Sequence, residues 1–221
     1  MSKMNKRFVL LDLICYAVIP FLIWNHAREF LGDYWAILLS TVPGFIYTIY
    51  RFFIEKQFNI AGLFIIGSLF ISTAVNLLSA TAESMLWNQV YLGFAFVAIY
   101  LLSIVFKKPL ALYFAVDWVY LQGFPRKEST KLFQTKGIFL WYQLLTLLFA
   151  VRGIFQNGFK AWLINVYGAD GYGKMLIYLN ISGWTFSVLI TLGFILIGVK
   201  INNYIKENRR TQLEKAVHTA E

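Results

Sequence analysis

The side chains most able to bind a ligand are a few polar residues in or beside long apolar stretches of this 221-residue chain. Amides and carboxylates hydrogen-bond polar molecules, arginine pairs with carboxylates and phosphates, and tryptophan supplies an apolar wall. Polar groups cost free energy in lipid, so they should face protein or a cavity. We therefore predict one ligand-binding pocket formed by Asn76, Glu83, Arg152, Asn180 and Trp184.

Arg152 has two interpretations. Its helical angle is nearly opposite the polar stripe of Gln143, Thr146 and Ala150, and it lies about one turn from the end of its stretch. Its guanidinium either reaches the lipid headgroups or pairs within the pocket, with Glu83 or Asn76 as the partner.

Asp12 is the only acid well inside an apolar stretch, about one turn from its beginning. An intramembrane carboxylate is a candidate for coupling to protons or cations. The alternative is a structural acid that reaches water. Its expected partners are Gln143, Tyr16 or a basic residue at the inner surface.

The sequence lacks the patterns of common catalytic and metal sites. It has one cysteine, Cys15, and two histidines, and it contains no P-loop, zinc-protease or serine-hydrolase motif. We predict that the protein is not an enzyme and has no catalytic residues, metal or cofactor.

The composition excludes a soluble globular enzyme and a disordered chain. Apolar residues make up 59% of the chain and charged residues 14%, whereas soluble domains carry about 25% charged residues. The net charge of +9 comes from basic residues between apolar stretches. We therefore expect membrane lipids with anionic headgroups as partners on the cytoplasmic side, and no nucleic acid.

Six apolar stretches are long enough to cross about 30 Å of hydrocarbon. Because a chain in lipid must satisfy its own backbone hydrogen bonds, they should be helices. The fold class is therefore all-α, an integral membrane protein with a single membrane domain over residues 1–221. The predicted spans are residues 8–24, 34–54, 60–80, 88–106, 137–156 and 175–199.

The distribution of lysine and arginine predicts the orientation. Sixteen of these twenty residues lie in the two terminal segments and the second and fourth connections, and three lie in the other connections. Basic residues concentrate on the cytoplasmic side, so both termini should be cytoplasmic. Asn76, Arg152 and Asn180 then lie in the outer half of the membrane.

The connection between the fourth and fifth spans is unusual. Residues 109–122 are apolar but too short to span, which indicates an interfacial segment or an extension of the fourth helix past a kink at Pro109. Residues 126–136 should form a basic linker. Residues 200–221 should form a polar cytoplasmic tail that continues the sixth helix.

Several spans carry small and polar residues at three- or four-residue spacing, which places them on one helix face. The first interpretation is packing seams with interhelical hydrogen bonds, and the second is a polar cavity. Pro20 and Pro43 should also kink the first two helices. The stripes are Ser68, Ser72 and Asn76; Gln143, Thr146, Ala150 and Gly153; and Asn180, Gly183, Ser187 and Thr191.

Residues 40–115 carry a set of short motifs. They include the proline-containing helix VPGFIYTIYR, the helix start NIAG and the helix exit SIVFKKPL. The segment resembles a family of bacterial inner-membrane proteins related to the intracellular septation protein A group, in which the exit usually reads R-P-L rather than Lys108-Pro109-Leu110. The resemblance implies a multi-pass protein of the bacterial cytoplasmic membrane with a role in envelope maintenance.

Two functions are consistent with these features. The first is binding or transport of a small molecule or lipid through the outer-half pocket. The second is a non-enzymatic scaffold for envelope or division proteins, in which the polar stripes are packing seams.

Overall fold

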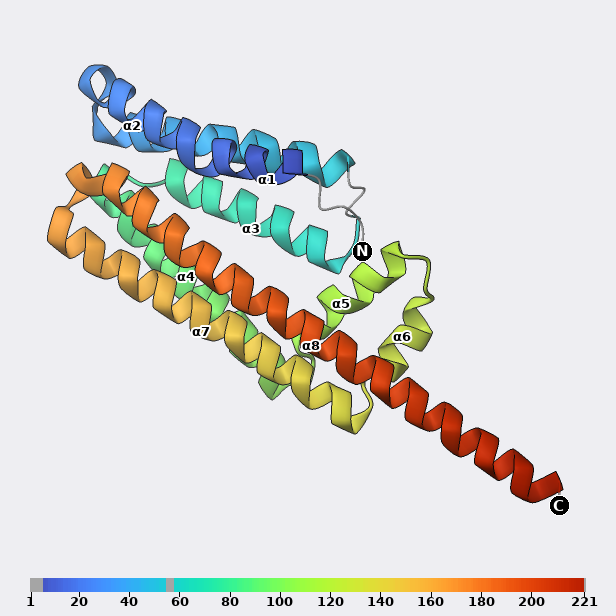
Figure 1. Ribbon diagram of the computed structural model, residues 1–221. Helices are drawn as coiled ribbons and strands as arrows, with labels where there is room; N and C mark the ends of the chain where they lie inside the picture. The colour runs from blue at the N-terminus through green and yellow to red at the C-terminus, as the bar shows by residue number, and fades with distance from the viewer. Residues whose placement is uncertain (1–5, 55–57, 221) are drawn as a thin grey trace. The chain divides into compact units, whose positions relative to one another are not determined.

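The computed structural model describes residues 6–54 and 58–220, and the described residues are almost entirely helical (Figure 1). The predicted all-α class is confirmed, and no strand occurs in either described range. The elements are α1 (Lys6–Leu13), η1 (Ile14–Val18), α2 (Ile19–Ile54), α3 (Ile60–Leu77), α4 (Ala82–Val105), α5 (Leu110–Leu121), α6 (Arg126–Phe133), α7 (Lys136–Tyr167), η2 (Ala169–Gly171) and α8 (Tyr172–Ala220).

Five helical segments of the described chain are long and apolar enough to cross a membrane. Many of their large apolar side chains are exposed, which is typical of a lipid-facing surface and not of a soluble monomer. The segments are Leu10–Ile54, Ile60–Leu77, Ala82–Val105, Gly137–Tyr167 and Ala169–Asn208.

The first of these segments folds back on itself. At 45 residues it would extend about 67 Å as one helix, but Gly32 interrupts it with non-helical φ and ψ of 75° and 169°. Residues near the two ends meet, since Arg51 Nη1 donates to Asp12 Oδ1 at 3.1 Å. The segment is therefore an antiparallel helical hairpin with Gly32 at its tip, where the sequence predicted a longer loop over residues 25–33.

The helix before Pro20 is irregular. Residues Ile14–Val18 form a π-helical turn, and Pro20 has no N–H to donate to the carbonyl of Tyr16 in the usual i+4 register. Asn180 Nδ2 lies 3.4 Å from that carbonyl oxygen and donates to it. A side chain of α8 thus supplies a donor where the proline removes one.

Several helices extend beyond the predicted apolar spans because they continue into polar sequence. Helix α4 begins at Ala82 rather than residue 88, since Thr81 and Ser84 form reciprocal hydrogen bonds that cap its start. Helix α7 continues to Tyr167, eleven residues past the predicted end. Residues 126–136, predicted as a linker, contain helix α6. The expected continuation of the sixth helix is confirmed, since α8 runs to Ala220.

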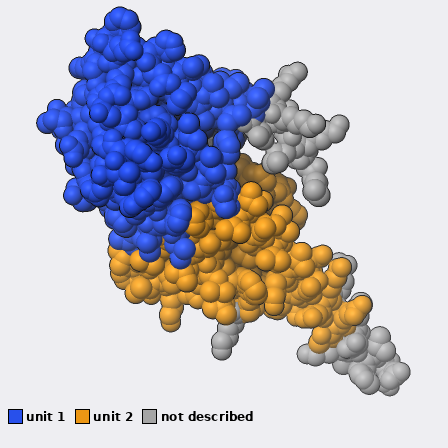
Figure 2. Space-filling model, turned by 60° about the vertical axis from the view of Figure 1, so that its left-hand side comes forward, with its two compact units in different colours: residues 1–99, 151–185 blue, residues 100–150, 186–221 orange. Residues whose placement is uncertain are grey.

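The chain forms two compact units (Figure 2). Helices α4, α7 and α8 each contribute residues to both. Unit 1 comprises residues 1–99 and 151–185, and unit 2 comprises residues 100–150 and 186–221. The core of unit 1 contains Trp24, Ile37, Met85, Leu86, Leu163, Tyr172 and Met175.

Unit 2 is built around α5, which the sequence predicted as an interfacial segment or an extension of the fourth helix. Lys107 has a positive φ of 55° and Pro109 is extended, so α5 is separate from α4. Ala111 and Leu112 of α5 are buried. Ala111 N–H donates to Thr146 Oγ1 at 3.2 Å, which ties the start of α5 to α7.

Candidate functional site

A chain of three polar side chains crosses unit 1 from α7 to α3. Lys160 Nζ donates to Gln89 Oε1, and Gln89 Nε2 donates to Asn76 Oδ1 at 2.8 Å. Asn76 is buried, and Gln89 and Lys160 are half-buried. We call these three residues the lysine–amide chain. It fixes the rotation of three helices about their axes and places a cation beside the core of unit 1.

The Asn76 end of the lysine–amide chain lies in the last turn of α3. The last carbonyls of a helix have no partner within the helix, and the hydroxyl of Tyr34 lies 3.4 Å from the carbonyl oxygen of Asn76 and 3.3 Å from that of Leu77. The second arm of α2 thus adds a hydrogen-bond donor to the carbonyls at this helix end, next to the Asn76 side chain.

The positive charge of Lys160 has no acidic partner among the residues that the structure describes. An ammonium group has three N–H donors, and the hydrogen bond to Gln89 uses one of them. A half-buried cation with one neutral partner is incompletely compensated, because burying a charge is costly unless it is paired. An anion at this position would supply the missing compensation.

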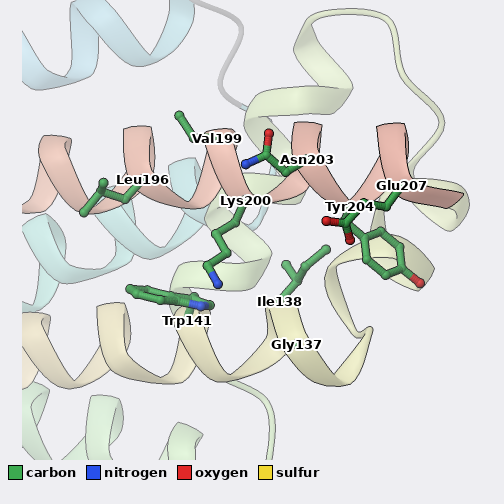
Figure 3. Close-up of a pocket in the computed structure, with 9 residues that line it drawn as sticks. All are labelled: Gly137, Ile138, Trp141, Leu196, Val199, Lys200, Asn203, Tyr204 and Glu207. Carbon is green, nitrogen blue, oxygen red and sulfur yellow. The ribbon is translucent and has the colours of Figure 1, made fainter. Parts of the chain in front are cut away.

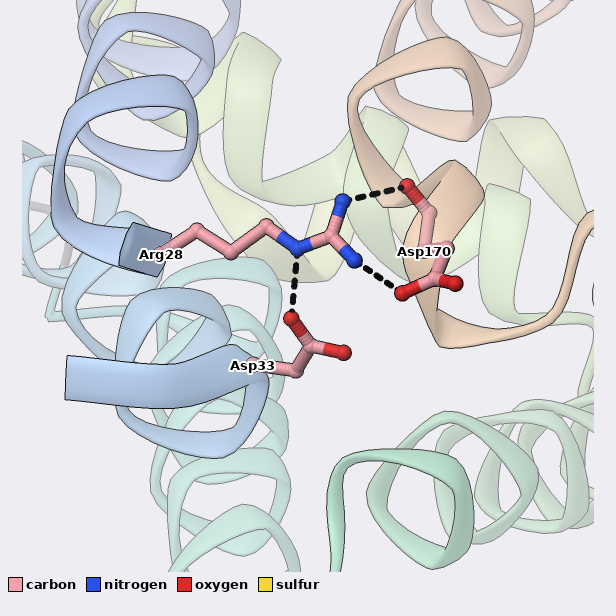
Figure 4. A network of polar contacts seen from close by, with 3 residues as sticks. All are labelled: Arg28, Asp33 and Asp170. Carbon is pink, nitrogen blue, oxygen red and sulfur yellow. Dashed lines mark hydrogen bonds and ion pairs between the residues drawn. The ribbon is translucent and has the colours of Figure 1, made fainter. Parts of the chain in front are cut away.

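A second polar cluster lies at the tip of the α2 hairpin, where one arginine pairs with two carboxylates (Figure 4). Arg28 Nε donates to Asp33 Oδ1 at 2.7 Å, and the guanidinium also forms an ion pair with Asp170. The Arg28 guanidinium lies over the Trp24 ring, 5.1 Å from its centre. This cluster ties the hairpin tip to the turn between α7 and α8.

Both polar clusters occupy the same end of unit 1. The tip of the α2 hairpin, the α3–α4 turn and the α7–α8 turn all lie at the left of Figure 1. Lys160 is about one helical turn before the buried Leu163 and Ile164. Asn88 Nδ2 also donates to Ser79 Oγ at 3.0 Å, which braces the α3–α4 turn.

The structure places the five predicted pocket residues in different surroundings. Asn76 belongs to the lysine–amide chain, and Asn180 bonds to the carbonyls of Leu176 and Tyr16. Glu83 and Trp184 are exposed. Within the described chain, no hydrogen bond or ion pair joins two of the five, so their common pocket stays a prediction.

Glu83 and Arg152 lie on different helices, α4 and α7. Glu83 lies in the first turn of α4, where a negative charge interacts favourably with the helix dipole. Arg152 is half-buried in α7. It forms no ion pair with Glu83, and no hydrogen bond to Asn76, among the described residues.

Asp12 pairs with a basic residue, one of its three expected kinds of partner. That residue is Arg51, and the two side chains are 40% and 32% exposed. Ion pairs this accessible contribute about 0–1 kcal/mol to stability. The geometry fits a structural acid that reaches water, and the predicted coupling role of Asp12 stays a prediction.

The predicted site residues did not include Gln89, Lys160, Arg28, Asp33 or Asp170. Lys160 stands between Phe159 and Ala161 in the apolar segment FKAWLINVY, and a lysine inside such a segment is a signal of a functional site. The predicted fifth span ends at residue 156, just before Asn157 and Gly158, and α7 continues through both of them.

The described residues contain no group of three histidine, cysteine or acidic side chains that could hold a metal ion. Comparisons with protein-family models, with curated proteins and with solved structures find no match to this chain.

Proposed function

We propose that this protein is a six-span, non-enzymatic protein of the bacterial cytoplasmic membrane that binds a small anionic molecule or the headgroup of an anionic lipid. The helical hairpin supports six crossings, because Gly32 divides Leu10–Ile54 into two arms, with 22 residues on each side of the glycine. Each arm is about 33 Å long, enough for one crossing of the hydrocarbon.

The orientation follows from the six crossings and the distribution of basic residues. With both termini cytoplasmic, the three connections at the left of Figure 1 face outward. The lysine–amide chain then lies in the outer half. The resemblance of residues 40–115 to proteins related to the intracellular septation protein A group supports a bacterial inner membrane as the location.

The observation that carries the binding proposal is the uncompensated charge of Lys160. Its two remaining N–H donors and the neighbouring amides of Gln89 and Asn76 offer hydrogen-bond donors and a positive charge. A carboxylate or phosphate would supply the missing negative charge, since charge-assisted hydrogen bonds are the strong ones. Binding is the step that any transport would require first.

Native mass spectrometry of protein extracted in a mild detergent tests the proposal. Wild-type protein and the variant Lys160→Arg should show the additional mass of a bound anion, and Lys160→Met should lack that additional mass. The matched control is Lys174→Met, because Lys174 is exposed in the same unit and lies 5.0 Å from the Tyr167 ring centre. Acetate, glutamate and inorganic phosphate should be compared as added ligands by thermal stabilisation.

The proposal is wrong if Lys160→Met retains the same bound mass as wild type. It is also wrong if no anion is retained and none of the three added ligands raises the melting temperature of the wild type more than it raises that of Lys160→Met.

The second candidate function, a scaffold, is favoured by closely packed helix seams. A Cβ atom added to Gly153 would lie 2.5 Å from Val97 Cγ2, and one added to Gly93 would overlap the Asn157 side chain. Helices α4 and α7 therefore approach closely through small residues, as in packing seams. A scaffold would co-purify with a second membrane protein whether or not Lys160 is replaced.

A further inference from the structure

Unit 2 contains a groove between α7 and α8 whose walls change from apolar to polar along its length. The groove has a volume of about 430 Å³. Leu196 and Val199 lie at one end, and Glu207 and Tyr204 lie at the other (Figure 3). None of its lining residues belongs to the lysine–amide chain, so it is a different site.

Lys200 marks the point where α8 leaves the apolar part of the sequence. The 25 residues before it, 175–199, contain no charged side chain. Its ammonium lies 5.3 Å from the centre of the Trp141 ring, on α7. Tryptophan and lysine both concentrate at the membrane–water interface, so the two helices present their interfacial residues at the same level.

The groove pairs one cation with one acid. Lys200 and Glu207 are seven residues apart on α8, which places them on one face about 10 Å apart along the axis. Figure 3 shows the Lys200 amine over Trp141 and the Glu207 carboxylate farther along α8, beside Tyr204. A ligand that fits must therefore carry a negative group, then a positive group, next to an apolar part.

We propose that this groove binds an ethanolamine phospholipid. Its phosphate lies at Lys200, its protonated amine at Glu207, and its acyl chains along Leu196 and Val199, which are 55% and 54% exposed. The charges of this headgroup match those of the groove, whereas the headgroup of an anionic phospholipid leaves Glu207 without a cationic partner.

The contact between Lys200 and Trp141 separates ethanolamine from choline. A choline headgroup has no N–H donor and is recognised by aromatic faces. The face of Trp141 is already occupied by the Lys200 ammonium. Glu207 instead offers a hydrogen-bond acceptor, which the primary amine of ethanolamine uses.

Native mass spectrometry with the full-length protein in detergent tests this proposal by titration with palmitoyl-oleoyl phosphatidylethanolamine, phosphatidylcholine and phosphatidylglycerol. The wild type should bind the ethanolamine lipid about three- to fivefold more tightly than the other two, as one accessible ion pair implies. Glu207→Gln should remove that preference without weakening the glycerol lipid. Lys200→Gln should weaken all three lipids.

Lys206→Gln is the matched control, because it removes the same charge from an exposed position on α8 outside the groove. It should leave all three affinities unchanged. Equal affinities of the wild type for the ethanolamine and glycerol lipids would overturn the proposal. So would an ethanolamine preference that survives Glu207→Gln, or equal losses in Lys200→Gln and Lys206→Gln.

Discussion

The hydroxyls of Tyr16 and Thr48 lie 2.7 Å apart, although 32 residues separate them along the chain. Their midpoint in the sequence is Gly32, the tip of the α2 hairpin. The Tyr16 ring also packs against Tyr47, with 5.7 Å between ring centres. These contacts fix the register of the two arms, so that the arms of the hairpin pack against each other.

Replacement of Gly32 should destabilise this hairpin. Its φ of 75° and ψ of 169° fall in a region that is accessible almost only to glycine. Gly32→Ala should lower the free energy of unfolding by about 1–3 kcal/mol, measured by denaturation in mixed micelles. Gly67→Ala is the control, because Gly67 is helical and has open space around it. Equal stability of the two variants would contradict the role assigned to Gly32.

The six-span arrangement predicts which connections react from outside the cell. In a Cys15→Ser background, Glu29→Cys at the hairpin tip should react with a membrane-impermeant maleimide in intact cells. Glu128→Cys in α6 should react only after the membrane is opened. A single crossing by Leu10–Ile54 predicts instead that position 29 is inaccessible in both conditions, because it would lie within the hydrocarbon.

The seam between α4 and α7 should respond to side-chain size. Gly153→Ala places a methyl group 2.5 Å from Val97 Cγ2, and Val97 is buried. The overpacking should cost about 1–3 kcal/mol of stability. The double variant Gly153→Ala with Val97→Ala should recover part of that loss, which a double-mutant cycle measures. Strictly additive losses would show that the two side chains do not compete for space.

The start of α5 should depend on one hydroxyl. Thr146 is fully buried, accepts from Ala111 N–H at 3.2 Å and donates to the carbonyl oxygen of Tyr142 at 2.8 Å. Thr146→Val keeps the shape but leaves the Ala111 N–H unsatisfied, at a cost of about 1–3 kcal/mol. Thr146→Ser should retain most of the stability. Thermal denaturation in detergent compares the two, and equal losses would exclude a role for the hydrogen bond.

The sequence predicted the helical class and the apolar segments, because a length of about 20 apolar residues is a direct requirement of the bilayer. It did not predict that the helix of the fifth span continues to Tyr167, or that residues 126–136 contain helix α6. Hydropathy indicates which residues contact lipid. Helix α6 and the last part of α7 contain polar residues, but their backbones still form helical hydrogen bonds.

The candidate site was harder to predict. Asn76 was predicted as a residue of a ligand-binding pocket, and in the structure its side chain accepts a hydrogen bond from Gln89. The identity of the partner depends on how α3, α4 and α7 are rotated about their axes. Helices that are apolar on all sides carry little periodicity to fix that rotation, so the link to Lys160 could not be derived from spacing.

The π-helical turn at Ile14–Val18 amounts to a one-residue insertion in an otherwise regular helix. Each residue of an α-helix turns the chain by about 100°, so everything before the turn is out of phase with everything after it by that angle. Removal of one residue from this turn would restore a regular helix and rotate Asp12 away from Arg51, although neither of these two residues is changed. A single-codon deletion there is therefore a larger structural change than most substitutions in the same helix.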